Sequence, residues 1–197
     1  MYQLYYQPEG IWVGDIMPYG KEGQFYVYHQ RDTRNPGPFG EPFGWALATT
    51  KDFVDYKDYG ESLMRGTDEE ADQFIYAGSV FETEAGFHAF YTGYSLTAEF
   101  QQTICHATSD DGITWTKDIA NPVITPMTEL YEKLDWRDPY VFYNEEDENY
   151  WILISARRLD MPVTRRGCIV LYRSKNLKDW TYYGPIYSPG HTNCPEC

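Results

Sequence analysis

The chain has 197 residues, enough for one sizeable domain, and its 30 acidic residues against 16 basic ones give a formal charge of −14. This acidity argues against a nucleic-acid binder and against a protein that binds an anionic membrane surface, and it suits a neutral ligand such as a sugar. The 19 tyrosines, 10 phenylalanines and 6 tryptophans predict an ordered, strand-rich domain whose core is built from rings, because aromatic residues bury large areas and favour strands.

Neither a signal peptide nor an apolar stretch of the roughly 20 residues that a membrane helix needs is visible in the sequence. The four cysteines are therefore expected to be reduced thiols, and the protein is expected to be cytoplasmic. The four histidines show no metal-ligand spacing with a cysteine or an acid, so we predict neither a metal nor a cofactor and expect ordinary strand or loop histidines. Two arginine pairs, at 157–158 and 165–166, are expected to be solvated loop charges.

A pair of similar segments recurs three times along the chain. The first segment is an aromatic-rich strand after a turn, and its copies follow one another at nearly equal steps when Phe25, Phe87 and Tyr150 are aligned. The second segment carries a serine or threonine six residues before an aromatic residue, and its copies lie at 48–56, 107–115 and 172–180. Each copy therefore predicts a unit of strands and polar turns, without a helix longer than a turn or two.

All-β units of this length indicate a β-propeller with one four-stranded sheet per unit. The alternative is a β-sandwich in which the similarity of the segments is coincidental. From its length the chain holds a little over three such units, whereas a closed propeller needs at least about four. We therefore predict a single, truncated propeller domain over residues 1–197, with about three and a half blades.

Three carboxylates fall at similar places in this repeat. Asp15 precedes Phe25 by nearly the same interval as Asp138 precedes Tyr150, and Glu196 follows Asp138 by nearly one full unit. The third unit has two extra residues in this interval, which are expected in the acidic hairpin that precedes Tyr150. Because the first strands of a propeller line its channel, the three acids are predicted to converge at one end of that channel. Chance register among the 30 acidic residues is the alternative.

Converging carboxylates suggest a reaction. Such groups repel one another and shift each other's pKa values, an arrangement that is costly unless function requires it. Glycoside cleavage requires it, because one carboxylate acts as nucleophile or base and one carboxylic acid protonates the leaving oxygen.

The sequences around the three acids resemble motifs of glycoside hydrolase family 32, the β-fructosidases. Trp12-Val-Gly-Asp15 is similar to the family's Trp-Met-Asn-Asp-Pro-Asn-Gly, Trp136-Arg-Asp-Pro139 to its Arg-Asp-Pro, and Glu196-Cys197 to the start of its Glu-Cys-Pro-Asp. The resemblance runs from about residue 10 to the end of the chain and includes shorter matches at 26–30, 44–45, 76–79, 107–115 and 121–124. It implies a propeller of the five-bladed glycosidase type.

The resemblance also implies roles for individual residues. Asp15 would be the nucleophile that attacks the anomeric carbon, and Glu196 would be the general acid and then the general base. Asp138 would hold sugar hydroxyls and stabilise the oxocarbenium-like transition state. The configuration would be retained through a glycosyl-enzyme intermediate, with the Asp15 and Glu196 carboxyls about 5–5.5 Å apart. The sugar subsite would be lined by Trp12, Gln30, Trp45, Tyr76 and Arg137.

The chain departs from the family's pattern at positions that contact substrate there. Gly14 replaces the asparagine before the nucleophile, and Ala77 replaces a serine. Arabinosidases and xylosidases of the related family 43 are therefore an alternative, and so is a carbohydrate-binding propeller without turnover. A thiol or zinc protein that uses Cys194 and Cys197 is a further alternative, although it lacks a second cysteine pair. The expected partner is a carbohydrate, without nucleic acid or membrane, and the sequence predicts no oligomeric state.

Overall fold

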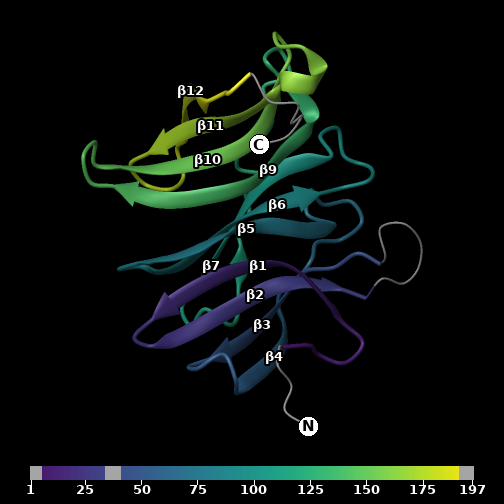
Figure 1. The fold of residues 1–197 in the computed structure, drawn as a ribbon, viewed down its shortest axis with the longest axis vertical. Coiled ribbons are helices and arrows are strands. Elements are labelled where there is room, and N and C mark those ends of the chain that lie inside the picture. Colours follow the sequence, from purple (N-terminus) through teal and green to yellow (C-terminus); the bar gives the residue numbers. More distant parts are fainter. Residues whose placement is uncertain (1–5, 34–40, 191–197) are drawn as a thin grey trace.

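A computed structural model describes residues 6–33 and 41–190 (Figure 1). Within these ranges the regular structure is β-strand, apart from the 3-10 helix η1 (Val163–Arg165). No helix in the described part of the chain is long and apolar enough to cross a membrane.

The described strands form three four-stranded antiparallel sheets, each with its strands in chain order. The first sheet contains β1 (Trp12–Lys21), β2 (Gln24–Asp32), β3 (Trp45–Thr50) and β4 (Tyr56–Leu63). The second contains β5 (Phe74–Thr83), β6 (Gly86–Tyr94), β7 (Gln102–Ser109) and β8 (Thr116–Lys117). The third contains β9 (Tyr131–Asn144), β10 (Asn149–Arg158), β11 (Gly167–Ser174) and β12 (Thr181–Tyr187). The prediction of all-β units with four strands each is confirmed. The start of a fourth unit is predicted at the chain end, but residues 191–197 lie outside the described ranges.

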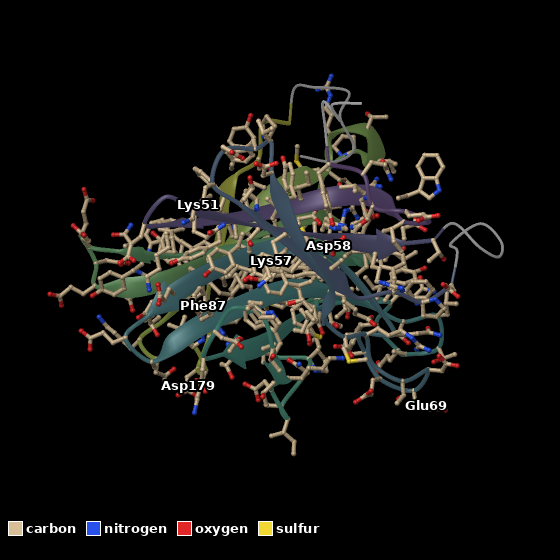
Figure 2. All side chains as sticks on the ribbon, turned by 90° about the horizontal axis from the view of Figure 1, so that it is seen from below. Lys51, Lys57, Asp58, Glu69, Phe87 and Asp179 are labelled. Carbon is tan, nitrogen blue, oxygen red and sulfur yellow. The ribbon has the colours of Figure 1, made fainter. Side chains whose placement is uncertain are left out.

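The first strands of the three sheets are neighbours, because β5 contacts both β1 and β9. The other strands of each sheet follow outward, so that the sheets lie side by side like propeller blades (Figure 1). Rings fill the space between the blades, as the composition predicted, and the largest fully buried side chains include Trp45, Trp136, Tyr28, Tyr91, Phe74 and Phe90. Charged residues such as Glu69 and Asp179 lie at the outside (Figure 2).

The repeat in the sequence corresponds to the same strand pair in each blade. The aligned residues Phe25, Phe87 and Tyr150 lie opposite the threonine or serine of the second segment, which is Thr50, Ser109 and Ser174 respectively. The two extra residues of the third unit lie in its first hairpin, as predicted. Residues 22–23 form the corresponding turn in the first blade, whereas residues 145–148 form it in the third.

The serine or threonine of the repeat accepts hydrogen bonds that begin a turn in every blade. Ser109 Oγ accepts bonds from the backbone N–H groups of Asp111 and Gly112, at 3.3 and 2.9 Å. The residue three positions after the serine or threonine has a positive φ in each blade, of 59° at Phe53, 69° at Gly112 and 64° at Leu177. The recurring serine or threonine is therefore explained by a turn that needs its hydroxyl.

Two histidines are part of a hydrogen-bonded chain inside the second blade. His106 Nδ1 lies 3.1 Å from Asp118 Oδ2, and His88 Nδ1 lies 3.0 Å from His106 Nε2. Hydrogen bonds from backbone and side-chain donors lower the pKa of Asp118, and the bond from the Ala120 N–H contributes most. The Asp118 carboxylate therefore accepts a bond from His106 Nδ1, and His106 Nε2 accepts one from His88 Nδ1, so both imidazoles are neutral and donate through Nδ1. Burial lowers the pKa of His106, and burial lowers the pKa of His88 to about 4.

We expect these histidines to make stability depend on pH. The unfolded chain takes up the proton of His88 near its ordinary pKa of 6.5, whereas the folded chain does so only near pH 4. The contribution of the neutral, buried His88 to the free energy of unfolding is therefore fully present above about pH 6.5. It is lost as the pH falls from there to about 4. Urea unfolding at a series of pH values should show this loss, and it should be smaller in His88→Phe. Parallel stability curves for the two proteins would contradict the assignment.

Candidate functional site

Each first strand is interrupted by a β-bulge near the same end of its blade, and the bulge of the third blade lies one residue closer to the first hairpin than the other two. In every case two residues of the first strand lie opposite one residue of the second strand. Bulges redirect side chains and are frequent beside active sites. The bulged residues are Gly14 and Asp15 on β1, Tyr76 and Ala77 on β5, and Asp138 and Pro139 on β9.

The bulges differ in where the two described acids fall within them, while the strand register keeps the acids aligned. Asp15 is the second bulged residue of β1, whereas Asp138 is the first bulged residue of β9. Counted from the strand pairs beside the first hairpin, however, the two acids occupy the same position, as the sequence repeat predicted. Asp15 lies two residues before Met17, which pairs with Tyr28, and Asp138 lies two residues before Tyr140, which pairs with Leu153. The corresponding residue of the second blade is Ala77, which lies two residues before Ser79, the partner of Phe90.

The bulges bring Asp15, Tyr76 and Asp138 to one hollow of about 490 Å³. The structure thus places side chains from all three blades around a single space, with Arg137 also in its wall. Glu196 lies outside the described residues, as do Cys194 and Cys197. The remaining lining residues, which the sequence did not single out, are Thr92, Tyr94, Gln101, Gln102 and Leu134.

The backbone at Asp138 is held in an unusual conformation. Its φ is +56°, a left-handed value that is uncommon for a residue other than glycine. Its N–H donates a hydrogen bond of 2.8 Å to Thr92 Oγ1, and the same hydroxyl donates to the carbonyl oxygen of Ala77 at 3.0 Å. Thr92 therefore ties the bulge of the second blade to that of the third. Strained backbone that the surroundings hold in place is typical of functional sites.

Arg137 is oriented by groups from two blades. Its Nη1 donates to Asp135 Oδ1 at 2.8 Å and to Gln102 Oε1 at 3.3 Å, and its Nε lies 3.7 Å from Asp138 Oδ2. Gln102 Oε1 also accepts the backbone N–H of Trp136 at 3.0 Å. The guanidinium thus has a fixed position beside the Asp138 carboxylate.

A chain of ion pairs continues from Arg137 away from the hollow. Asp135 Oδ2 lies 3.6 Å from Arg157 Nη1, Arg157 Nε lies 3.5 Å from Glu132 Oε2, and Glu132 Oε1 accepts a bond from Arg166 Nη1. Each of these side chains is only 16–22% exposed. The expectation of solvated loop charges is therefore wrong for Arg157 and Arg166, because the end of β10 and the loop after it pack against the start of β9.

Asp135 separates two guanidinium groups, so its loss should be costly. We expect Asp135→Asn to lower the free energy of unfolding by about 1–3 kcal/mol, because Arg137 and Arg157 would then face each other with no carboxylate between them. Asp160→Asn is the matched control, since the Asp160 side chain is 65% exposed in its pair with Arg158 and should contribute less than about 1 kcal/mol. Urea unfolding of both variants checks this, and equal effects would contradict it.

The predicted subsite residues differ in their positions. Tyr76 lines the hollow, and its ring packs edge-on against Phe43 and Tyr94 at 5.4 and 5.5 Å. Trp12 is 59% exposed and is not part of the wall of the hollow. Gln30 is only 8% exposed and contacts Asp15 instead, with Nε2 donating to Asp15 Oδ2 at 3.0 Å.

The placement of Trp45 in a sugar subsite is wrong. Trp45 is on β3, two strands away from the channel, and its side chain is fully buried. The ring packs against Tyr28 and Tyr91, and its indole N–H donates to the Tyr76 carbonyl oxygen at 2.9 Å. It therefore supports the Tyr76 bulge from behind and does not reach the hollow.

One of the missed residues had a signal in the sequence. Gln30 and Thr92 each lie opposite the bulge of their blade, and the step between them equals the step that separates Phe25 from Phe87. Applying that step to Gln30 would have found Thr92. Leu134 and Tyr94 have no such signal. Among the described residues, no group of three or more His, Cys, Asp or Glu side chains is placed to hold a metal ion.

A family model described as the N-terminal domain of glycosyl hydrolases family 32 matches residues 5–197. An extracellular exo-inulinase of Aspergillus niger is 30% identical over 98% of this chain and 40% of its own length. A levanase of Bacillus subtilis is 32% identical over 91% of this chain and 25% of its own length. The chain thus spans well under half the length of these relatives. Because several relatives are named extracellular, the comparisons do not support the predicted cytoplasmic location.

Solved structures share the arrangement of the blades. Fructan 1-exohydrolase IIa from Cichorium intybus superposes with a TM-score of 0.78 at 21% identity, over 95% of this chain and 35% of the other. Fructofuranosidase from Schwanniomyces occidentalis, in complex with fructose, gives a TM-score of 0.73 at 24% identity, over 93% of this chain and 36% of the other. This likeness confirms the propeller fold.

Proposed function

The chain belongs to glycoside hydrolase family 32, and we propose that the full-length protein that carries these blades is a retaining glycosidase of β-fructosides. The observation that carries this proposal is the meeting of Asp15 and Asp138, from different blades, in one hollow with Arg137 and Tyr76. The names of the relatives, which include exo-inulinase, levanase and fructofuranosidase, support a β-fructoside as the substrate. Because the chain belongs to family 32, a β-fructoside is favoured over the arabinosides and xylosides of the family 43 alternative.

In the proposed reaction Asp15 attacks the anomeric carbon of the fructosyl unit while Glu196 gives its proton to the leaving oxygen. The bond between the anomeric carbon and that oxygen breaks, and an ester forms between the sugar and Asp15. Glu196 then takes a proton from water, whose oxygen attacks the same carbon and frees Asp15. Two displacements at one carbon retain its configuration. The role of Glu196 rests on the Glu-Cys motif, since this residue lies outside the described part of the chain.

Asp138 and Arg137 are proposed to bind the fructosyl unit rather than to react with it. Asp138 carries its carboxylate at the wall of the hollow, where sugar hydroxyls can donate to it. A carboxylate there also stabilises the positive charge that develops in the oxocarbenium-like transition state. Arg137 balances the local negative charge, and its contacts with Asp135 and Gln102 keep it in place.

We expect two substitutions to remove nearly all turnover. In the full-length protein, Asp15→Asn and Glu196→Gln should each lower kcat on sucrose, inulin or levan by about 10³-fold or more, because each removes a group that makes or breaks a bond. Asp110→Asn, in an exposed turn of the second blade, is the control and should retain full activity. Liberated fructose measures turnover.

Two other outcomes would contradict the proposal. Unchanged hydrolysis in both variants would remove the assignment of Asp15 and Glu196. Binding of fructosides by calorimetry, without hydrolysis of any of the three substrates by the unaltered protein, would instead indicate a carbohydrate-binding propeller.

A further inference from the structure

We propose that Gln30 is a positioning residue for Asp15, and that glycine at position 14 provides the space in which Gln30 can do so. This inference rests on the proposed function, in which Asp15 is the nucleophile. It concerns a departure from the family's motif, where asparagine stands at the position of Gly14.

The side-chain amide of Gln30 lies between Gly14 and Asp15. Its Nε2 donates a hydrogen bond of 3.0 Å to Asp15 Oδ2. Its Oε1 faces Gly14, where an added Cβ would lie only 2.5 Å from that oxygen and 3.3 Å from Gln30 Cβ and Cδ. The donor end of the amide therefore reaches the carboxylate only because position 14 has no side chain.

The requirement at Gly14 is for space and not for backbone conformation. Gly14 is absent from the glycines with positive φ in the described part of the chain, so its backbone accepts an ordinary L-residue. The atom closest to an added Cβ is the end of a flexible side chain. A residue with a Cβ at this position would therefore displace the Gln30 amide without disrupting the strand.

The other two described blades show the reverse arrangement at the equivalent positions. There the residue that corresponds to Gly14 carries a side chain, Tyr76 or Arg137, and the residue that corresponds to Gln30 is Thr92 or Ser155. Neither Thr92 nor Ser155 has an amide that could reach the next residue of its first strand. Of the three described blades, only the first combines an empty position with a long amide side chain, which is why we treat Gly14 and Gln30 as one unit.

A fixed carboxylate is what a nucleophile needs. Binding of Oδ2 by the amide restricts the rotation of the Asp15 side chain and leaves Oδ1 for attack on the anomeric carbon. Gln30 is 8% exposed and is not part of the wall of the hollow, so it acts on Asp15 and not on the bulk of the sugar. Its loss should therefore lower kcat more than it changes KM.

A double-mutant cycle in the full-length protein tests the pair. Gly14→Ala and Gln30→Ala should each lower kcat on sucrose roughly 10-fold to 100-fold, the range expected for one hydrogen bond to a charged group, with KM within about threefold. The kcat of the double variant should lie within about twofold of the kcat of the less active single variant, since both changes remove the same contact. Gln30→Glu should lose at least as much activity as Gln30→Ala, because it replaces a donor with a second carboxylate.

Two control variants lie on the same strands. Gly20→Ala adds a Cβ that would lie an ordinary 3.5 Å from the Phe25 ring, and Gln24→Ala removes an amide that donates to the Thr50 carbonyl oxygen at 2.8 Å. Both should keep kcat within about twofold. Thermal unfolding of all variants separates lost positioning from lost folding.

Three results would overturn the inference while leaving the proposed function intact. The first is a loss of kcat in the double variant that equals the product of the two single losses. The others are an activity of Gly14→Ala equal to that of Gly20→Ala, and full activity of Gln30→Glu. An unaltered protein that hydrolyses no fructoside would instead contradict the proposed function, and this inference with it.

Discussion

The β-bulge in each first strand is the constraint on which the site depends. An unbroken strand presents alternate residues to opposite faces, so neighbouring residues cannot serve the same end of a channel. A bulge places two residues opposite one and redirects a side chain. A bulge near the same end of each of the three blades brings Asp15, Tyr76 and Asp138 to one hollow, although each lies a full unit of the repeat away from the next along the chain.

The blades hold these bulges in position through polar contacts that cross from one sheet to the next. Thr92 bonds to both the second and the third bulge, and the indole of Trp45 in the first blade supports the carbonyl of Tyr76 in the second. Ser79 Oγ similarly accepts the N–H of Val141 at 3.0 Å. These bonds lie beside cores of tightly packed rings, where unsatisfied polar groups are costly. The packing between the blades therefore also fixes the positions of the bulged residues at the site.

The sequence was sufficient to predict the blades and the approximate place of the acids. The regular step of the repeat, the serine or threonine of the turn and the longer hairpin before Tyr150 all correspond to features of the structure. The bulges themselves, and the one-residue difference in the place of the third bulge, could not be predicted, because counting along a strand does not reveal where a bulge begins. Trp45 was misplaced for a related reason: a motif indicates which residues are near a site, but it does not indicate which face of a strand they occupy. The ion pairs from Asp135 to Arg166 depend on a loop that folds back on β9, and no local pattern indicates that contact.

The central claim is that Asp15 forms a bond with the sugar, and trapping that bond tests it most directly. The full-length protein would be mixed with an activated β-fructoside, quenched in acid within milliseconds and digested, and its peptides examined by mass spectrometry. We expect a fructosyl adduct on the peptide that contains Asp15, at the Asp15 carboxylate. An adduct on another residue would contradict it, and so would rapid hydrolysis with inversion of configuration and without any adduct.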